Sequence, residues 1–279
     1  MWILRFLTAL LGLFGEGRSP AMMLNLVVPR SGYRLRRDLP YGPGPRQRFD
    51  LYLPETLPSP APVLLFFYGG AFRTGRKSEY RVVGEAFASA GIIVAVADYR
   101  IYPNARFPGF LEDGAMALAA VHARAAEFGG DPNRIFLAGH SAGAYIAVML
   151  AADPSYVRGA RADPAWIRGV VGIASSYGNS PPGVVPNPVF EGRAPAQTQP
   201  GFFIDAKRPP MLLVSGAKDI AANLESARNL AAKLRAVASE VEEIVYPNPG
   251  HMGIILSLAP RFRHIAPLRD DIARFMAAH

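Results

Sequence analysis

The stretch RIFLAGHSAGAYIAVMLAAD, Arg134 to Asp153, decides the fold because a strand pattern runs directly into a helix pattern. Its first part is an apolar, β-forming run closed by Gly139. Its second part is a string of good helix formers that ends before Pro154, a residue that cannot continue a helix. Ser141 stands where the chain reverses between the two, with glycines on either side in the spacing Gly-x-Ser-x-Gly.

The serine at this join has two explanations. Its hydroxyl can cap the N-terminus of the following helix, a common role that involves no chemistry. It can also be a nucleophile, held on a sharp strand-to-helix turn so that the side chain projects from the end of a sheet. An all-apolar strand before Ser141 and an all-apolar helix after it supply the structural context of that turn, which favours the nucleophile.

A serine nucleophile needs a histidine as base and an acid that orients the histidine. In this type of turn the acid and then the histidine follow the serine along the chain. His251 lies in YPNPGHMG, directly after the last strand-like stretch, and Asp219 follows MLLVSG by three residues. The sequence therefore predicts a Ser141-Asp219-His251 triad, with Glu225 as the alternative acid.

The reaction also needs N–H donors for the oxyanion of the tetrahedral intermediate. One candidate is the backbone N–H of Ala142, the residue after the serine. The other is the loop FFYGGAF, 66–72, which follows an earlier strand and whose glycines let the backbone approach a substrate closely.

Composition limits the other functional classes. The 279 residues, 50% hydrophobic and 19% charged, suffice for one α/β domain. The chain has no cysteine and its five histidines stand apart, so we expect no metal site and no cofactor. The net charge of +8 is concentrated before residue 50 but forms no Lys/Arg-rich run, so we expect no nucleic-acid partner.

Strand-like and helix-like stretches alternate along the chain. Continuous apolar strands surrounded by helices are typical of a largely parallel sheet covered on its faces. An alternating stretch, QRFDLYLP at 47–54, predicts an antiparallel edge strand after an approach strand. Asp98-Tyr99-Arg100 is expected to tether the loop that follows its strand. Further strands are predicted at 61–72, 92–100, 134–139, 167–175, 209–217 and 241–248, and helices at 79–91, 107–129, 142–152 and 224–238.

We divide the chain into an N-terminal segment, 1–40, and a catalytic domain, 41–279. Residues 1–14 are apolar but too short, at about 1.5 Å per residue, to span a bilayer core of about 30 Å. One interpretation is a helix that caps the active site. Another is that the protein is cytoplasmic and contacts a membrane through residues 1–18, helped by the arginines that follow. A secretory signal is a third alternative, although no small-residue cleavage site follows. The oligomeric state is left open.

Residues 176–210 carry eight prolines and no periodicity, which predicts a lid or pocket-wall excursion rather than a plain loop. Its aromatic residues would be unusual in water and are expected to face the substrate. The expected pocket residues are Tyr68, Phe72, His140, Tyr177, Phe190, Phe202, Phe203 and Met252.

Five motifs in order, YGGAF, ADYRIYP, DPNRIFLAGHSAGA, SGAKDI and GHMG, resemble the α/β-hydrolase esterases over about residues 45–278. Among these the chain is most similar to the hormone-sensitive-lipase-like and prenylcysteine-methylesterase-like carboxylesterases. The resemblance implies an α/β fold with an eight-stranded, mostly parallel sheet and helices on both faces. It also implies the same triad, and Gly70, Ala71 and Ala142 as oxyanion donors, with Gly69 shaping the turn.

Two positions depart from the family pattern. The family's His-Gly-Gly-Gly is here Tyr68-Gly69-Gly70-Ala71, so a Cβ stands where the family has glycine and should narrow the acyl pocket. The usual Gly-Asp-Ala-Asp is here Gly216-Ala217-Lys218-Asp219.

The expected function is therefore hydrolysis of small, short-chain carboxylic esters through an acyl-enzyme. One alternative is amide hydrolysis of the arylformamidase type, which uses the same groups. A second is a non-catalytic binding protein on this fold, against which the ordered serine, aspartate and histidine argue.

Overall fold

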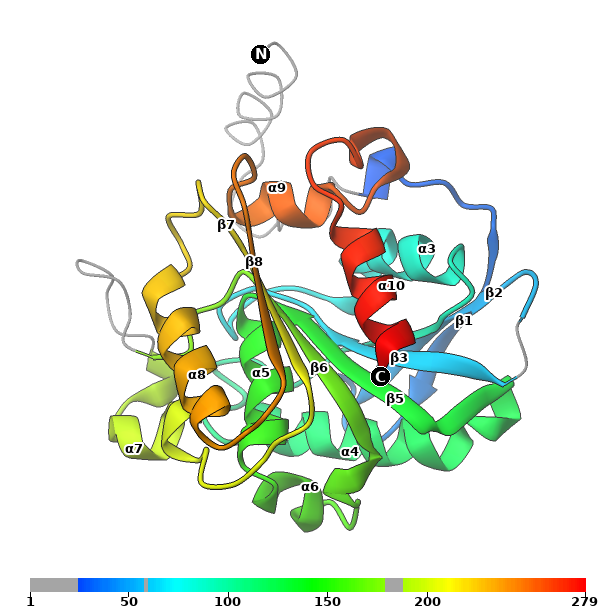
Figure 1. The fold of residues 1–279 in the computed structure, drawn as a ribbon. Coiled ribbons are helices and arrows are strands. Elements are labelled where there is room, and N and C mark those ends of the chain that lie inside the picture. The colour runs from blue at the N-terminus through cyan, green and yellow to red at the C-terminus, as the bar shows by residue number, and fades with distance from the viewer. Residues whose placement is uncertain (1–24, 58–59, 179–187) are drawn as a thin grey trace.

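A computed structural model describes residues 25–57, 60–178 and 188–279. Its centre is an eight-stranded sheet in the order β1-β2-β4-β3-β5-β6-β7-β8 (Figure 1). β3 to β8 pair in parallel, whereas β2 is antiparallel to both β1 and β4. The predicted mostly parallel α/β sheet is confirmed. The strands are β1 (Tyr33–Pro40), β2 (Arg48–Pro54), β3 (Ala61–Phe67), β4 (Ile93–Ala97), β5 (Gly130–His140), β6 (Ile167–Ile173), β7 (Met211–Gly216) and β8 (Val241–Tyr246).

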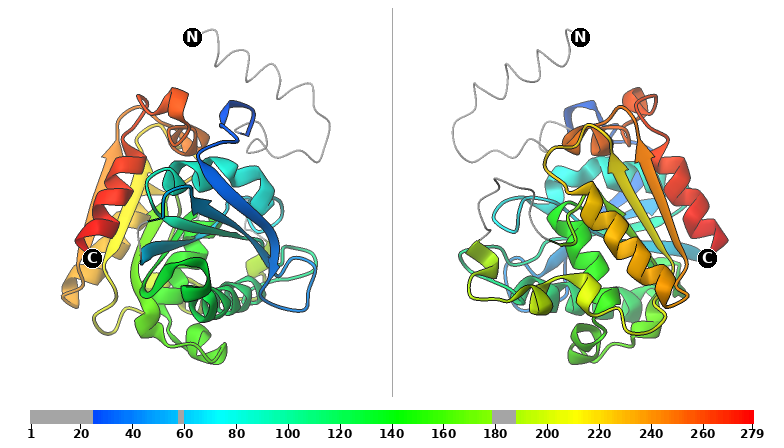
Figure 2. Two further views of the ribbon diagram at one scale, coloured as in Figure 1. Left: turned by 90° about the vertical axis from the view of Figure 1, so that its right-hand side faces the viewer. Right: turned by 60° about the vertical axis from the view of Figure 1, so that its left-hand side comes forward.

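Helices cover both faces of the sheet, as predicted (Figures 1 and 2). α3 and α10 lie together on one face, and α4, α5 and α8 lie on the other. α9 and α10 were not predicted from the sequence. The helices are α3 (Arg81–Ala88), α4 (Gly109–Arg124), α5 (Ala142–Ala152), α6 (Ser155–Gly159), α7 (Pro195–Thr198), α8 (Leu224–Ala236), α9 (His251–Leu256) and α10 (Leu268–Ala278).

The core is densest around β3, β5 and α5. All residues of α5 are buried, which explains why this helix has no polar face. The helix rests on β5, β6 and β3, so the end of β5 and the start of α5 are fixed by apolar packing. The turn at Ser141 is therefore held between two rigid elements.

The prediction that residues 47–54 form an edge strand is wrong. β2 is flanked by β1 and β4, and β1 is the edge. The alternation was misleading because Asp50, which looks like an outward-facing position, is 1% exposed and is neutralised by Lys77 Nζ at 2.9 Å from its Oδ1. The exposed arginines of β1, Arg34 and Arg36 among them, protect the true edge.

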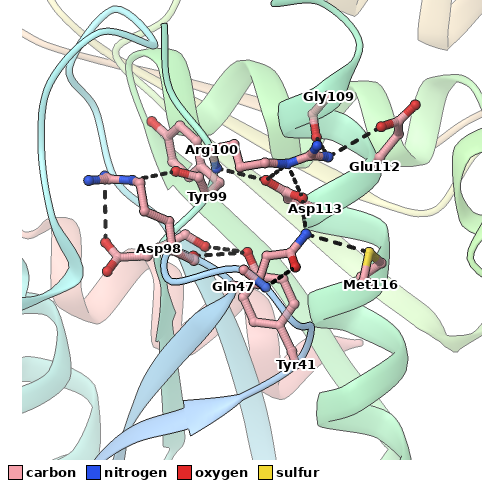
Figure 3. Close-up of polar contacts among 11 residues, drawn as sticks. Tyr41, Gln47, Asp98, Tyr99, Arg100, Gly109, Glu112, Asp113 and Met116 are labelled. Atoms are coloured by element: carbon pink, nitrogen blue, oxygen red, sulfur yellow. Dashed lines mark hydrogen bonds and ion pairs between the residues drawn. The ribbon is translucent and has the colours of Figure 1, made fainter. Parts of the chain in front are cut away.

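The segment Asp98–Arg100 tethers its loop as predicted (Figure 3). Arg100 Nε lies 2.9 Å from Asp113 Oδ1 on α4, and the fully buried Asp113 also accepts from Gln47 Nε2 at 2.8 Å. Asp98 accepts the N–H of Lys77 at 2.8 Å. These bonds join the segment after β4 to α4 and to Lys77, and join α4 to the loop before β2.

Two predictions fall wholly or partly on residues outside the described ranges. The N-terminal helix and the proposed contact through residues 1–18 lie outside them. The excursion 176–210 is described except for 179–187, and its described part contains short helical turns, including α7. Within the described ranges, no helix has the length and apolar character needed to cross a membrane.

Candidate active site

Ser141 occupies the tight turn between β5 and α5. Its φ is 53° and its ψ −121°, a conformation that costs energy for a residue with a Cβ. The turn also requires the flanking glycines, because a Cβ on Gly139 would lie 2.2 Å from the Gly143 carbonyl carbon, and one on Gly143 would lie 2.0 Å from the Phe67 oxygen. The Ser141 side chain forms no capping hydrogen bond to α5. The Ser141 hydroxyl is therefore not used as an N-cap, and the turn has the geometry expected for a nucleophile.

Asp219 and His251 form a hydrogen-bonded pair at the ends of neighbouring strands. Asp219 follows β7, and His251 is the first residue of α9, in the segment after β8. Asp219 Oδ2 lies 2.9 Å from His251 Nδ1. The carboxylate is 3% exposed and the imidazole 23% exposed, so the histidine remains open to a substrate while its acid does not.

The surroundings of Asp219 keep its carboxyl ionised. Burial raises the pKa of Asp219, but the hydrogen bond and charge of His251, with N–H donors from Ala222 and Ala221, outweigh it and hold the pKa below its ordinary value of 3.8. The two backbone bonds to Asp219 Oδ1 measure 2.9 Å and 2.8 Å. Glu225, the alternative acid, is exposed on the first turn of α8 and makes no hydrogen bond to His251 within the described chain.

His140 links Ser141 to the histidine segment. Its ring centroid is 4.7 Å from that of His251, and its Nε2 lies 3.0 Å from the His251 carbonyl oxygen. Within the described residues the Ser141 hydroxyl makes no hydrogen bond of its own. Contacts between nucleophile and base are often loose without substrate, so this geometry is compatible with a triad.

The loop after β3 brings backbone N–H groups to the serine. Gly69 approaches so closely that a Cβ there would lie 3.0 Å from Ser141 Cβ. Gly70, Ala71 and Phe72 all have positive φ, at 138°, 52° and 61°. Within the described residues the N–H groups of Gly70 and Ala142 have no acceptor, whereas the Gly69 N–H donates to Tyr80 Oη at 3.2 Å.

Three of the predicted pocket residues are almost fully buried next to this site. Tyr68, His140 and Tyr177 are 0%, 1% and 4% exposed. Tyr68 Oη accepts from Arg46 Nη2 at 2.5 Å, and Tyr177 Oη faces the backbone of Gly172. These buried side chains stabilise the loops around the site. The roles of Arg46 and Tyr80 were not predicted from the sequence.

Two of the predicted pocket residues meet in an aromatic cluster beside the oxyanion loop. Phe72, directly after Ala71, has its ring centroid 5.5 Å from that of Phe190. The same ring stacks on Phe110 at 4.3 Å and meets Tyr145 edge-on at 5.6 Å. The cluster of Phe72, Phe110, Tyr145 and Phe190, called the aromatic wall below, fills space next to Ala71.

The remaining predicted pocket residues lie outside the aromatic wall. Phe203 is half-buried against the core. Phe202 is exposed, and its ring centroid lies 4.9 Å from Lys233 Nζ. Met252, next to His251, lines an open hollow of about 510 Å³ together with Leu256 and Ile265. The described part of the chain holds no group of three His, Cys, Asp or Glu side chains that could bind a metal.

Comparisons with known proteins agree with this geometry. The BD-FAE model matches residues 49–157, and the model of the prolyl oligopeptidase family matches residues 116–270. A probable isoprenylcysteine alpha-carbonyl methylesterase of Arabidopsis thaliana is 28% identical over 80% of this chain and 52% of its own length. Esterase LipC of Mycobacterium tuberculosis is 32% identical over 78% of this chain and 60% of its own. The chain thus spans less than two thirds of these relatives.

Solved structures share the fold. A truncated carbohydrate esterase from gut microbiota superposes with a TM-score of 0.78 at 18% identity, covering 90% of this chain and 98% of that one. A phosphonate-inhibited esterase B from Lactobacillus rhamnosis gives 0.78 at 17% identity, covering 99% and 94%. The predicted α/β-hydrolase fold and the predicted resemblance to esterases are confirmed. Because the prolyl oligopeptidase model spans more than half of the sequence, including Ser141, Asp219 and His251, this chain belongs to the prolyl oligopeptidase family.

Proposed function

We propose that this protein is a serine carboxylesterase that hydrolyses small, short-chain esters through an acyl-enzyme. The observation that carries the proposal is the Asp219–His251 pair, 2.9 Å between Oδ2 and Nδ1, next to a serine held at φ 53°. Relatives named as esterases support it.

The chemistry follows from the positions of three side chains. Ser141 Oγ attacks the ester carbonyl carbon while His251 Nε2 takes the hydroxyl proton. Asp219 accepts from Nδ1–H, which fixes the histidine tautomer and stabilises the imidazolium as it forms. The imidazolium then protonates the departing alcohol, leaving an acyl group on Ser141. Water, deprotonated by His251, releases the acid and restores the hydroxyl.

The negative charge on the carbonyl oxygen needs N–H donors in a fixed place. Ala142, at the start of α5, offers one, and its helix end adds a partial positive charge. Gly70 and Ala71 supply the others in this proposal. The Gly69 N–H is already bonded to Tyr80, so its contribution is the close approach of the turn to Ser141.

The acyl group should be short, because Ala71 Cβ and the aromatic wall both occupy volume next to the oxyanion loop. Each buried CH₂ adds at most about 0.8 kcal/mol of binding, and the gain ends once the space is filled. A glycine at position 71 would remove the Cβ and relieve the positive φ of 52°.

A panel of 4-nitrophenyl esters tests this proposal. Acetyl to hexanoyl esters should react fastest, and a serine-directed phosphonate should abolish the activity. Ala71→Gly should move the optimum towards longer or bulkier acyl groups. An enzyme fastest on dodecanoyl esters would contradict the acyl-pocket argument. Phosphonate-sensitive cleavage of formanilides but not of esters would favour the amide-hydrolase alternative, and no covalent labelling would favour a binding protein.

Peripheral membrane contact through residues 1–18 is a further part of the proposal, supported by an apolar run followed by arginines. Deletion of residues 1–18 should release the protein from anionic vesicles in a sedimentation assay and leave turnover of a soluble acetyl ester unchanged. Vesicle binding of the full chain should weaken as salt rises. A changed acyl-length profile after the deletion, with no vesicle binding by the full chain, would favour the cap instead.

A further inference from the structure

Three segments of the site are joined by one hydrogen-bonded chain through a tyrosine and a histidine. The Gly69 N–H of the oxyanion loop donates to Tyr80 Oη at 3.2 Å. Tyr80 Oη lies 3.2 Å from His140 Nδ1, and His140 Nε2 lies 3.0 Å from the His251 carbonyl oxygen. Because His140 directly precedes Ser141, this series of hydrogen bonds connects the oxyanion loop, the nucleophile turn and the start of α9. We call it the Tyr80–His140 relay.

The partners permit only one direction of donation for a neutral His140. The His251 carbonyl can only accept, so Nε2 must carry the hydrogen. Nδ1 of the neutral ring is then an acceptor, and Tyr80 must donate its hydroxyl hydrogen to it. The Tyr80 oxygen is left to accept from the Gly69 N–H, which can only donate. Every donor and acceptor is satisfied, as expected for a buried polar network that fixes one geometry.

We propose that Tyr80 and His140 are positioning residues, which hold the oxyanion loop and the His251 backbone in register with Ser141. This inference rests on the proposed esterase function. Both side chains are buried, with His140 1% and Tyr80 2% exposed, and the His140 ring packs against the His251 ring with 4.7 Å between the centroids. Asp219 orients the ring of His251, and the relay holds its backbone.

The environment keeps the relay in its neutral form. Burial, and next the neighbouring His251, lower the pKa of His140 to about 3, against partial compensation from its bond to the His251 carbonyl and from Asp219. A protonated His140 would present an N–H to Tyr80 and compete with Gly69 for its oxygen. A neutral ring also avoids a second positive charge beside the imidazolium formed during the reaction.

Disruption of the relay should lower kcat more than it changes KM. Misplacement of about 1 Å at reacting groups can cost on the order of 10²-fold in rate. In the proposed function the acyl group lies against the aromatic wall, which has no bond to Tyr80 or His140 within the described chain. Loss of an interaction that is needed mainly in the transition state lowers kcat and kcat/KM together.

Tyr80→Phe removes only the central hydroxyl and keeps the ring that packs on Phe66 and Tyr68. We expect kcat per phosphonate-titrated site to fall on the order of 10²-fold, with KM for 4-nitrophenyl acetate nearly unchanged. Tyr246→Phe is the matched control, because the Tyr246 ring is also buried and its hydroxyl donates to Asp271, outside the relay. Because phosphonate titration counts the active sites, it distinguishes a lower turnover per site from a smaller fraction of folded protein.

A pair of variants at His140 tests the relay while Tyr80 is left unchanged. Glutamine offers a carbonyl oxygen to Tyr80 and an amide hydrogen to His251, whereas leucine offers neither. His140→Gln should therefore keep kcat within about tenfold of wild type, and His140→Leu should lose on the order of 10²-fold. If either variant does not fold, the other and Tyr80→Phe still give the comparison.

A pH titration of stability adds a readout independent of turnover. Between pH 6.5 and about 3, the unfolded chain binds a proton at His140 that the folded chain does not, so the contribution of His140 to stability falls as pH falls. His140 alone should reduce the folding equilibrium constant by up to about tenfold per pH unit in that window. His140→Gln should remove that share of the slope.

Two kinds of negative result remain distinguishable. If wild type lacks activity, or keeps it in Ser141→Ala, the esterase proposal fails. If wild type is active and Ser141-dependent, but Tyr80→Phe matches Tyr246→Phe per titrated site, or His140→Leu matches His140→Gln, the relay is structural only and the inference is overturned.

Discussion

Ser141→Ala should lower ester turnover by about 10⁶-fold, the scale seen when a triad nucleophile is removed. Alanine keeps a Cβ at φ 53°, so the turn keeps the strain it has with serine, and loss of the hydroxyl is the main change. Turnover of 4-nitrophenyl acetate by purified protein, with circular dichroism to verify folding, measures the effect.

The result also decides where the nucleophile lies. Phosphonate labelling followed by peptide mass mapping should place the adduct on the peptide containing Ser141 and should give none with the variant. A folded Ser141→Ala protein with near-normal turnover would contradict the whole mechanism.

Asp219→Asn should lower turnover by about 10⁴-fold, because a neutral amide no longer fixes the productive tautomer of His251. In the present structure the carboxylate accepts from Nδ1 at 2.9 Å and from two backbone N–H groups. An asparagine can donate to Nδ1 instead, which places the imidazole hydrogen on Nε2, where a lone pair is needed. The kcat ratio on one soluble ester checks this.

Glu225→Gln is the matched control for that change. Glu225 is exposed on α8, so the variant should retain activity close to wild type. If Glu225→Gln proves more damaging than Asp219→Asn, the acid has been assigned to the wrong residue.

The same aspartate predicts a change in acid stability. The pKa of Asp219 is held below 3.8 in the folded state, so its contribution to stability is present above the unfolded pKa and is lost as pH falls through the lower folded value. Asp219→Asn should therefore reduce the difference in Tm between neutral pH and pH 3.

Local sequence determined the centre of this protein. The run from Arg134 to Asp153 predicted β5, the tight turn and α5, because the preference for strand, glycine turn and helix is local to each segment. Chain order also placed Asp219 and His251 at the ends of successive parallel strands, and such ends meet at one edge of a sheet. That is why a pair 32 positions apart could be proposed before any contact was visible.

The tertiary structure decided which polar groups meet. Asp50 resembles a surface residue in sequence, yet it lies buried because Lys77 neutralises it across the loop. Tyr80 carries no signal, since its partner His140 is 60 positions away, and His140 reaches a carbonyl 111 positions further on. Phe190 joins the aromatic wall, whereas Phe202 from the same aromatic-rich stretch stays exposed. Periodicity and local propensity specify segments, but hydrogen-bond partners and pocket walls depend on how distant segments pack, which only the folded chain determines.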